Sequence, residues 1–160
     1  MFSNWHLFIP PVLTLLDDPS TLIKLSGMAA LSDLLDKVPP KLLEQTGLGE
    51  IMEEAMIPTL SFLPTLTPVD ESLLLLNAAY DTLQKLTDVR FWDEKSKQKK
   101  QKVLDKILRE GVQHGIHHCH QNNQIIRLLL TVMEKLINRM EIQAIKHLKV
   151  FYYEFPERHN

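Results

Sequence analysis

The stretch that decides the fold is TPVDESLLLLNAAYDTLQKLT, residues 67–87. Its apolar side chains recur at spacings of three and four residues, which places them on one face of an α-helix. These residues are Leu73, Leu76, Tyr80 and Leu83. The stretch also opens like a helix, because Thr67 offers an N-cap hydroxyl, Pro68 suits the first helical position and Asp70 supplies a carboxylate three residues after the cap. The sequence therefore predicts a helix over residues 69–87.

Three further apolar stripes extend this helical pattern along the chain. They comprise Leu31, Leu34, Leu35 and Val38; Leu104, Ile107, Leu108 and Gly111; and Ile126, Leu129, Met133 and Leu136. No segment shows the sustained alternation of apolar and polar residues that marks a half-buried strand. The predicted fold class is therefore all-α.

The helices are expected to form pairs that repeat along the chain. The second helices of the pairs are predicted at residues 20–38, 69–87 and 124–140, and the first helix of the third pair at about residues 99–119. The second helices begin near residues 21, 69 and 123, at spacings of 48 and 54 residues, slightly longer than the about 40–47 of HEAT and armadillo repeats. We therefore expect an α-solenoid of HEAT-like, armadillo-like helix pairs rather than a closed bundle. Three pairs and the start of a fourth at Ile142 would form one domain over residues 1–149, followed by a divergent tail at residues 150–160.

Proline and glycine mark the expected helix boundaries. Pro39-Pro40 should end one helix and open a short one that Gly47 closes, and Ser20 can cap the helix that follows it. Two first helices carry internal prolines, which helix-pair solenoids tolerate as kinks. These prolines are Pro10, Pro11 and Pro58.

Composition excludes several classes of protein. The chain of 160 residues is 44% hydrophobic and 24% charged, which fits one folded domain. Its net charge of −2 argues against a nucleic-acid binder. A single cysteine rules out an internal disulfide and suits a reducing compartment. The start lacks the basic region and cleavage site of a signal peptide, and no apolar run is long enough to cross a bilayer, so neither secretion nor a membrane partner is expected.

The stretch HGIHHCHQNN, residues 114–123, is the main candidate metal site, because it combines histidines with the single cysteine. If the preceding helix continues at 100° per residue, His118 and Cys119 point toward the core while His117 and His120 point away, so these side chains cannot surround one ion. Neither HExxH nor paired CxxC spacing is present. We therefore predict no metal and no cofactor, with a zinc-dependent protein as the less favoured alternative.

The other chemistry-bearing segments give no catalytic motif. The lysines at positions 95–102 are interpreted as a solvated linker that runs into a helix, although contacts with phosphate are the alternative. No serine, histidine or acidic residue stands in a recognisable catalytic setting. The sequence therefore predicts that the chain is not an enzyme and has no catalytic residues.

Several segments together resemble one known family. They read PPVLTLLDDPSTLIKLSG, PPKLLEQTGLGEIMEEAMIPTLSFLPTLTPVDESLLLLNAAY, LDKILREGV and IKHLK, and they extend from about Pro10 to Lys149. In this order they look like the C-terminal half of the Tel-two-interacting protein two family, which supplies a subunit of the TTT complex. Family members are much longer, so the chain is expected to be a fragment or a short isoform.

The resemblance implies a scaffold α-solenoid without catalysis, present in the cytoplasm and the nucleus. The implied partners are the large Tel-two-interacting protein one and the Tel-two subunit, with which the family acts as a co-chaperone beside the Hsp-ninety class of chaperone. The implied clients are the phosphatidylinositol-kinase-related kinases of DNA-damage and nutrient signalling. Arg109, Glu110, Lys146 and Lys149 lie in the matching segments and are the candidate partner-binding residues. The alternative is a generic helical-repeat adaptor with other partners.

Overall fold

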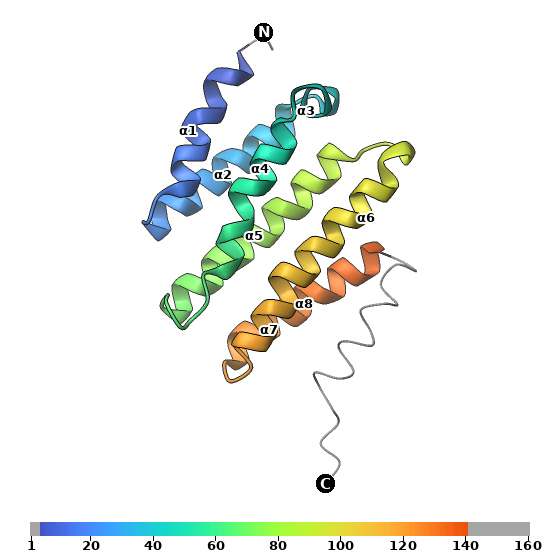
Figure 1. Cartoon of the computed structure of the whole chain (residues 1–160). Coiled ribbons are helices and arrows are strands. Elements are labelled where there is room, and N and C mark those ends of the chain that lie inside the picture. The colour runs from blue at the N-terminus through green and yellow to red at the C-terminus, as the bar shows by residue number, and fades with distance from the viewer. Residues whose placement is uncertain (1–3, 141–160) are drawn as a thin grey trace.

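All the regular elements of the described chain are helices (Figure 1). The computed structural model describes residues 4–140, and residues 1–3 and 141–160 lie outside this description. Within residues 4–140 no strand is present, which confirms the predicted all-α class. The expected start of a fourth pair at Ile142 and the expected tail at residues 150–160 lie outside the described residues.

The elements follow the predicted order of helix pairs. Their bounds are α1 Trp5–Asp17, α2 Thr21–Lys37, α3 Pro40–Thr46, α4 Leu48–Met56, the 3-10 helix η1 Ile57–Ser61, α5 Val69–Arg90, the 3-10 helix η2 Glu94–Ser96, α6 Lys97–Lys106, the π-helix η3 Ile107–Gln113, α7 His114–His118 and α8 Asn123–Met140. The three predicted second helices, α2, α5 and α8, begin within one residue of their expected starts.

The pairs stack side by side in two layers (Figure 1). One layer holds α1, α4 with η1, and the continuous helix formed by α6, η3 and α7. The other holds α2, α5 and α8, in which α5 packs against both of its neighbours and so separates them. This side-by-side stacking of helix pairs is the arrangement of an α-solenoid.

The middle helix, α5, forms the centre of the core because it is covered by both neighbouring pairs. Its buried residues include Leu75, Leu76, Ala79, Tyr80, Leu83 and Leu86. This double burial explains why its apolar residues form a broad band instead of a single narrow stripe. Most of the residues in the predicted stripes are buried, although Leu73, Ile126 and Met133 are only partly covered.

Proline and glycine set the boundaries largely as predicted. The short helix α3 starts at Pro40 and ends before Gly47, whose φ of 69° is the left-handed conformation that glycine adopts without strain. Helix α1 continues through its two internal prolines. The helix that carries Pro58 instead tightens into η1, because proline has no N–H for a regular helical hydrogen bond.

Two predicted N-caps differ in detail from the structure. Helix α5 begins after an extended Pro68, so this proline and not Thr67 occupies the N-cap position. Ser20 does occupy the N-cap position of α2, but its side chain makes no capping hydrogen bond. Its backbone N–H donates instead to the Asp18 carboxylate at 2.8 Å, so the acidic turn supplies the acceptor.

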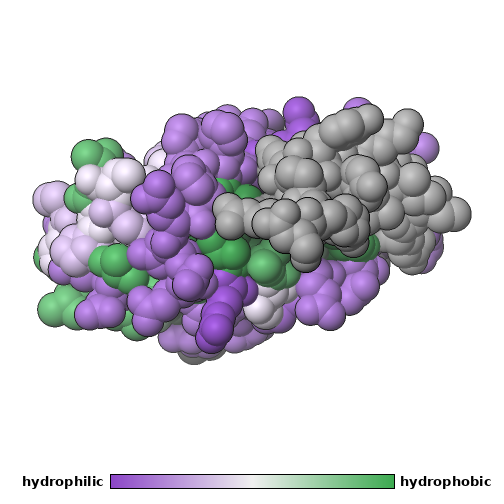
Figure 2. All heavy atoms as spheres, turned by 90° about the horizontal axis from the view of Figure 1, so that it is seen from below, coloured by the Kyte–Doolittle hydropathy of each residue, from purple (hydrophilic) through white to green (hydrophobic). Residues whose placement is uncertain are grey.

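The face shown in Figure 2 is mostly hydrophilic, with hydrophobic residues at its left end and near its middle. Leu7 and Phe8 on α1 are 60% and 58% exposed, and Leu22 on α2 is 75% exposed. The end pair formed by α1 and α2 therefore buries only the face that it turns toward α4 and α5.

Candidate functional site

The histidine stretch lies at the C-terminal end of the continuous helix formed by α6, η3 and α7. The centroid of the His118 ring lies 4.2 Å from that of His114 and 5.3 Å from that of His117, so these three rings lie against one another. Cys119 is buried, whereas His114, His117, His118 and His120 are exposed. The prediction that His118 points toward the core with Cys119 is therefore wrong. Within residues 4–140, no group of three or more His, Cys, Asp or Glu side chains is placed to hold a metal ion.

The π-helix η3 is the physical reason for this difference. Apart from Asp105, the buried residues between Leu104 and Cys119 recur every four positions, in two columns. The columns are Leu104, Leu108, Val112 and Ile116, and Ile107, Gly111, Gly115 and Cys119. A regular α-helix would rotate such a column by about 40° every four residues. The wider turn of η3 takes up this rotation, so the residues after it face other directions than a uniform 100° step assigns. The four-residue recurrence was the signal in the sequence that could have revealed the shift.

A close approach between η3 and α5 occurs at Gly111. A Cβ atom there would lie 2.6 Å from the Tyr80 hydroxyl, so only glycine leaves room for this contact. Tyr80 is fully buried, and its hydroxyl has no hydrogen-bond partner within the described part of the chain. Burial raises the pKa of Tyr80 far above its usual value and keeps the ring neutral.

The predicted partner-binding residues lie on the surface where they are described. Arg109 and Glu110 are exposed on η3. The Arg109 guanidinium donates to the Asp105 carboxylate one turn earlier, at 2.9 Å. Lys146 and Lys149 lie outside the described residues, so the structure brings together only half of this set. A partner contact for these residues stays a prediction.

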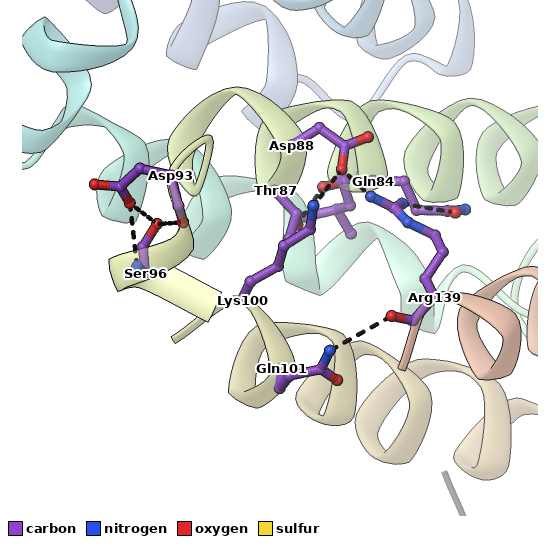
Figure 3. A network of polar contacts seen from close by, with 9 residues as sticks. Gln84, Thr87, Asp88, Asp93, Ser96, Lys100, Gln101 and Arg139 are labelled. Carbon is purple, nitrogen blue, oxygen red and sulfur yellow. Dashed lines mark hydrogen bonds and ion pairs between the residues drawn. The ribbon is translucent and has the colours of Figure 1, made fainter. Parts of the chain in front are cut away.

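The opposite end of the same helix holds a constellation that the sequence did not single out. Trp92 stands in the short connection between α5 and η2, and its side chain is 53% exposed. Asp93 fixes this connection by accepting hydrogen bonds from the Ser96 hydroxyl and, at 3.1 Å, from the Ser96 backbone N–H (Figure 3). The hydrogen bond from the Ser96 side chain is the main reason why the pKa of Asp93 lies below its usual value.

A network of polar side chains joins three helices beside this connection (Figure 3). The Asp88 carboxylate on α5 pairs with Lys100 of α6, at 3.0 Å, and with Arg139 of α8. Arg139 also donates to the Gln84 side chain at 3.1 Å, and its carbonyl accepts from Gln101 at 3.4 Å. The network therefore holds the ends of α5, α6 and α8 in a fixed relation.

A second, mostly buried ionic cluster links α4 to α5 and α6. Glu53 of α4 pairs with Arg90 of α5 and, at 3.3 Å, with Lys106 of α6. Glu53 is only 7% exposed, so both cations are needed to offset the cost of burying its charge. The Arg90 side chain runs across Gly49, where a Cβ atom would lie 2.7 Å from it.

Two hollows flank Trp92, and both are lined by it and its neighbours Phe91 and Asp93. The larger, which we call the Trp92 hollow, has a volume of about 370 Å³ and lies between α3, the start of α4 and α6. Its further lining includes Leu43, Glu44, Glu50, Lys99, Lys102 and Val103. The smaller hollow has a volume of about 250 Å³ and includes Arg139 of the polar network in its wall.

The predicted lysine linker therefore forms part of a built surface. Lys97 already begins α6, two residues earlier than the predicted start of that helix. No aromatic residue lies within positions 95–102 themselves, yet the fold places Trp92 and Lys99 in one hollow. The position of Trp92 shortly before the lysine run was the signal in the sequence that could have indicated this site. The site is complete only when α3 and α4 pack beside the run, which the sequence pattern does not show.

None of the helices over residues 4–140 is both long and apolar enough to cross a membrane.

Comparison with known proteins places this fold in a family. A sequence model described as the Tti2 family matches residues 2–156. A curated relative, the TEL2-interacting protein 2 of Saccharomyces cerevisiae (strain ATCC 204508 / S288c), is 26% identical over 170 residues, which cover 97% of this chain and 39% of the relative. The chain thus spans well under half the length of that relative. No solved structure matches it significantly. Because the family match covers nearly the whole sequence, the chain belongs to the Tti2 family.

Proposed function

We propose that this chain is a non-catalytic, protein-binding subunit of the TTT complex. The observation that carries the proposal is the match of the Tti2 family model to residues 2–156. The name of the yeast relative, a TEL2-interacting protein, supports a role in binding another protein.

The architecture suits such a role. Stacked helix pairs present one extended surface to which each pair contributes side chains, and proteins built this way commonly bind partners along that surface. Here the pairs are tied together by ionic clusters that cross from one to the next, as Glu53 does between α4 and α6. A rigid stack lowers the entropy lost when a partner binds.

The finer proposal follows the resemblance of the sequence. The partners are the large Tel-two-interacting protein one and the Tel-two subunit, and together they act as a co-chaperone with the Hsp-ninety system. The clients are the phosphatidylinositol-kinase-related kinases, and the sites of action are the cytoplasm and the nucleus. Arg109 and Glu110, exposed on η3, together with Lys146 and Lys149, supply contacts to a partner.

Reconstitution from purified components tests this proposal. The tagged chain is mixed with the large Tel-two-interacting protein one and the TEL2 protein, and retention of both is quantified. We expect stoichiometric capture, weakened by Arg109→Glu and unaffected by the matched control Arg127→Glu, because Arg127 is exposed on α8 outside the proposed contact set. Failure of the unaltered chain to capture either partner would favour a generic helical-repeat adaptor and contradict the proposal. Equal capture by both variants would remove Arg109 from the interface.

A further inference from the structure

The Trp92 hollow combines features that protein-binding sites share. Trp92 is half exposed at its edge, and tryptophan is among the residues that most often contribute strongly to binding energy. Apolar side chains of Leu43 and Val103 contribute to the lining. An exposed aromatic ring beside an apolar recess can hold an apolar side chain of a partner.

The two sides of the hollow carry opposite charges. Glu44 and Glu50 come from α3 and α4, and both are exposed. Lys99 and Lys102 come from α6, and both are also exposed. None of these four side chains forms an ion pair with another residue over positions 4–140. The hollow thus separates an acidic side from a basic side, and neither charge set neutralises the other directly.

The other charged groups of the hollow are already engaged. Arg90 pairs with buried Glu53, and Asp93 accepts the hydrogen bonds of Ser96. These contacts hold the connection that carries Trp92 before any partner arrives. A site held in this way loses little conformational freedom on binding.

We propose that the Trp92 hollow is a docking site for a segment of a partner protein in which an apolar side chain lies between a basic and an acidic residue. The apolar side chain packs against Trp92, the basic residue faces Glu44 and Glu50, and the acidic residue faces Lys99 and Lys102. Charges that complement both sides fix the direction of the segment as well as its position.

This charge pattern selects the class of occupant. A nucleic acid or a purely acidic peptide would place negative charge against Glu44 and Glu50 as well as against the lysines, and like charges in such an interface are costly. A segment with both signs avoids this cost. The inference rests on the proposed function, because the partner is taken to be a subunit of the same complex.

Binding of the chain to purified TEL2 protein together with the large Tel-two-interacting protein one, measured by titration, tests this proposal. We expect Trp92→Ala to weaken binding about thirtyfold, which is the effect of losing a central aromatic contact. Circular dichroism of each variant establishes that it is folded. The matched control for the charge variants is Lys37→Glu with Lys135→Glu, since both lysines are exposed and neither lines the hollow.

Exchanging the charges on the two sides of the hollow distinguishes an effect of their arrangement from an effect of the net charge of the chain. Lys99→Glu with Lys102→Glu should weaken binding about tenfold, and so should Glu44→Lys with Glu50→Lys. The variant with all four changes keeps the net charge of the chain, yet it should bind as weakly as either pair or more weakly, because the direction of the segment is reversed. Binding by this variant at the unaltered affinity would overturn the inference, as would equal binding by Trp92→Ala and the unaltered chain. Absence of binding by the unaltered chain would overturn the proposed function and, with it, this inference.

Discussion

The two ends of the continuous helix formed by α6, η3 and α7 contrast sharply. Its C-terminal end carries four histidines and the cysteine between positions 114 and 120, yet the histidines are exposed, the cysteine is buried and no three such side chains of the described structure are placed to hold a metal ion. Its N-terminal end carries ordinary lysines, but α3, α4 and the end of α5 join it to enclose the Trp92 hollow. Reactive residue types close in sequence do not make a site. Residues brought together from several helices do.

The largest effect on stability is expected in the middle of this helix, where η3 determines which way the side chains after it face. Gly111→Ala would place a Cβ atom 2.6 Å from the Tyr80 hydroxyl. We expect a loss of about 1–3 kcal/mol in the free energy of unfolding, which is typical of overpacking a core. Urea denaturation measures this loss.

The second variant, Tyr80→Phe, tests the cause. Removing the hydroxyl relieves the closest contact and removes a buried polar atom that has no hydrogen-bond partner in the described chain. In the double variant, Gly111→Ala should therefore cost clearly less than it does alone. Additive losses would contradict the view that this contact requires glycine.

The orientation of the histidine end is tested next, by thiol labelling. Cys119 is buried, and burial raises the pKa of its thiol, so it should react slowly. His118→Cys in a Cys119→Ala background should react much faster, because position 118 is exposed. Slow labelling at position 118 would mean that this end keeps regular α-helical register and faces the core.

The sequence was sufficient where local pattern alone determines structure. The start of α5 at Val69, the short helix between Pro40 and Thr46, and the turn at Gly47 all follow from residue spacing and backbone chemistry. The direction of His118 was not predicted correctly, because a uniform step per residue has no place for the wider turn of η3. The Trp92 hollow depends on packing between pairs, which periodicity within one helix does not contain.

A smaller effect is expected at the N-terminal end, on acidification. The folded-state pKa of Asp93 lies below its usual value of 3.8, chiefly through the Ser96 hydrogen bond, so its ionised form stabilises the connection. This contribution is present above pH 3.8 and is lost as the pH falls through the lower folded-state value. Asp93→Asn should reduce this part of the acid dependence in thermal melts recorded as a function of pH. An unchanged dependence would show that the carboxylate does not stabilise the connection.

The smallest effect on stability is expected from the addition or removal of metal ions. Since no three His, Cys, Asp or Glu side chains within residues 4–140 are placed to hold a metal ion, neither added zinc nor chelation should change the melting temperature or the helical signal in circular dichroism. Elemental analysis of the purified chain serves as the check. Stoichiometric zinc whose removal lowers helicity would make the histidine end the functional one and reverse the comparison.

Hydrogen exchange in the assembled complex compares the two ends most directly. The chain is measured alone and with purified TEL2 protein and the large Tel-two-interacting protein one. The proposed docking at the Trp92 hollow predicts slower exchange at residues 91–103 on binding and unchanged exchange at residues 114–118. Complex formation with protection at the histidine end and none at residues 91–103 would contradict it.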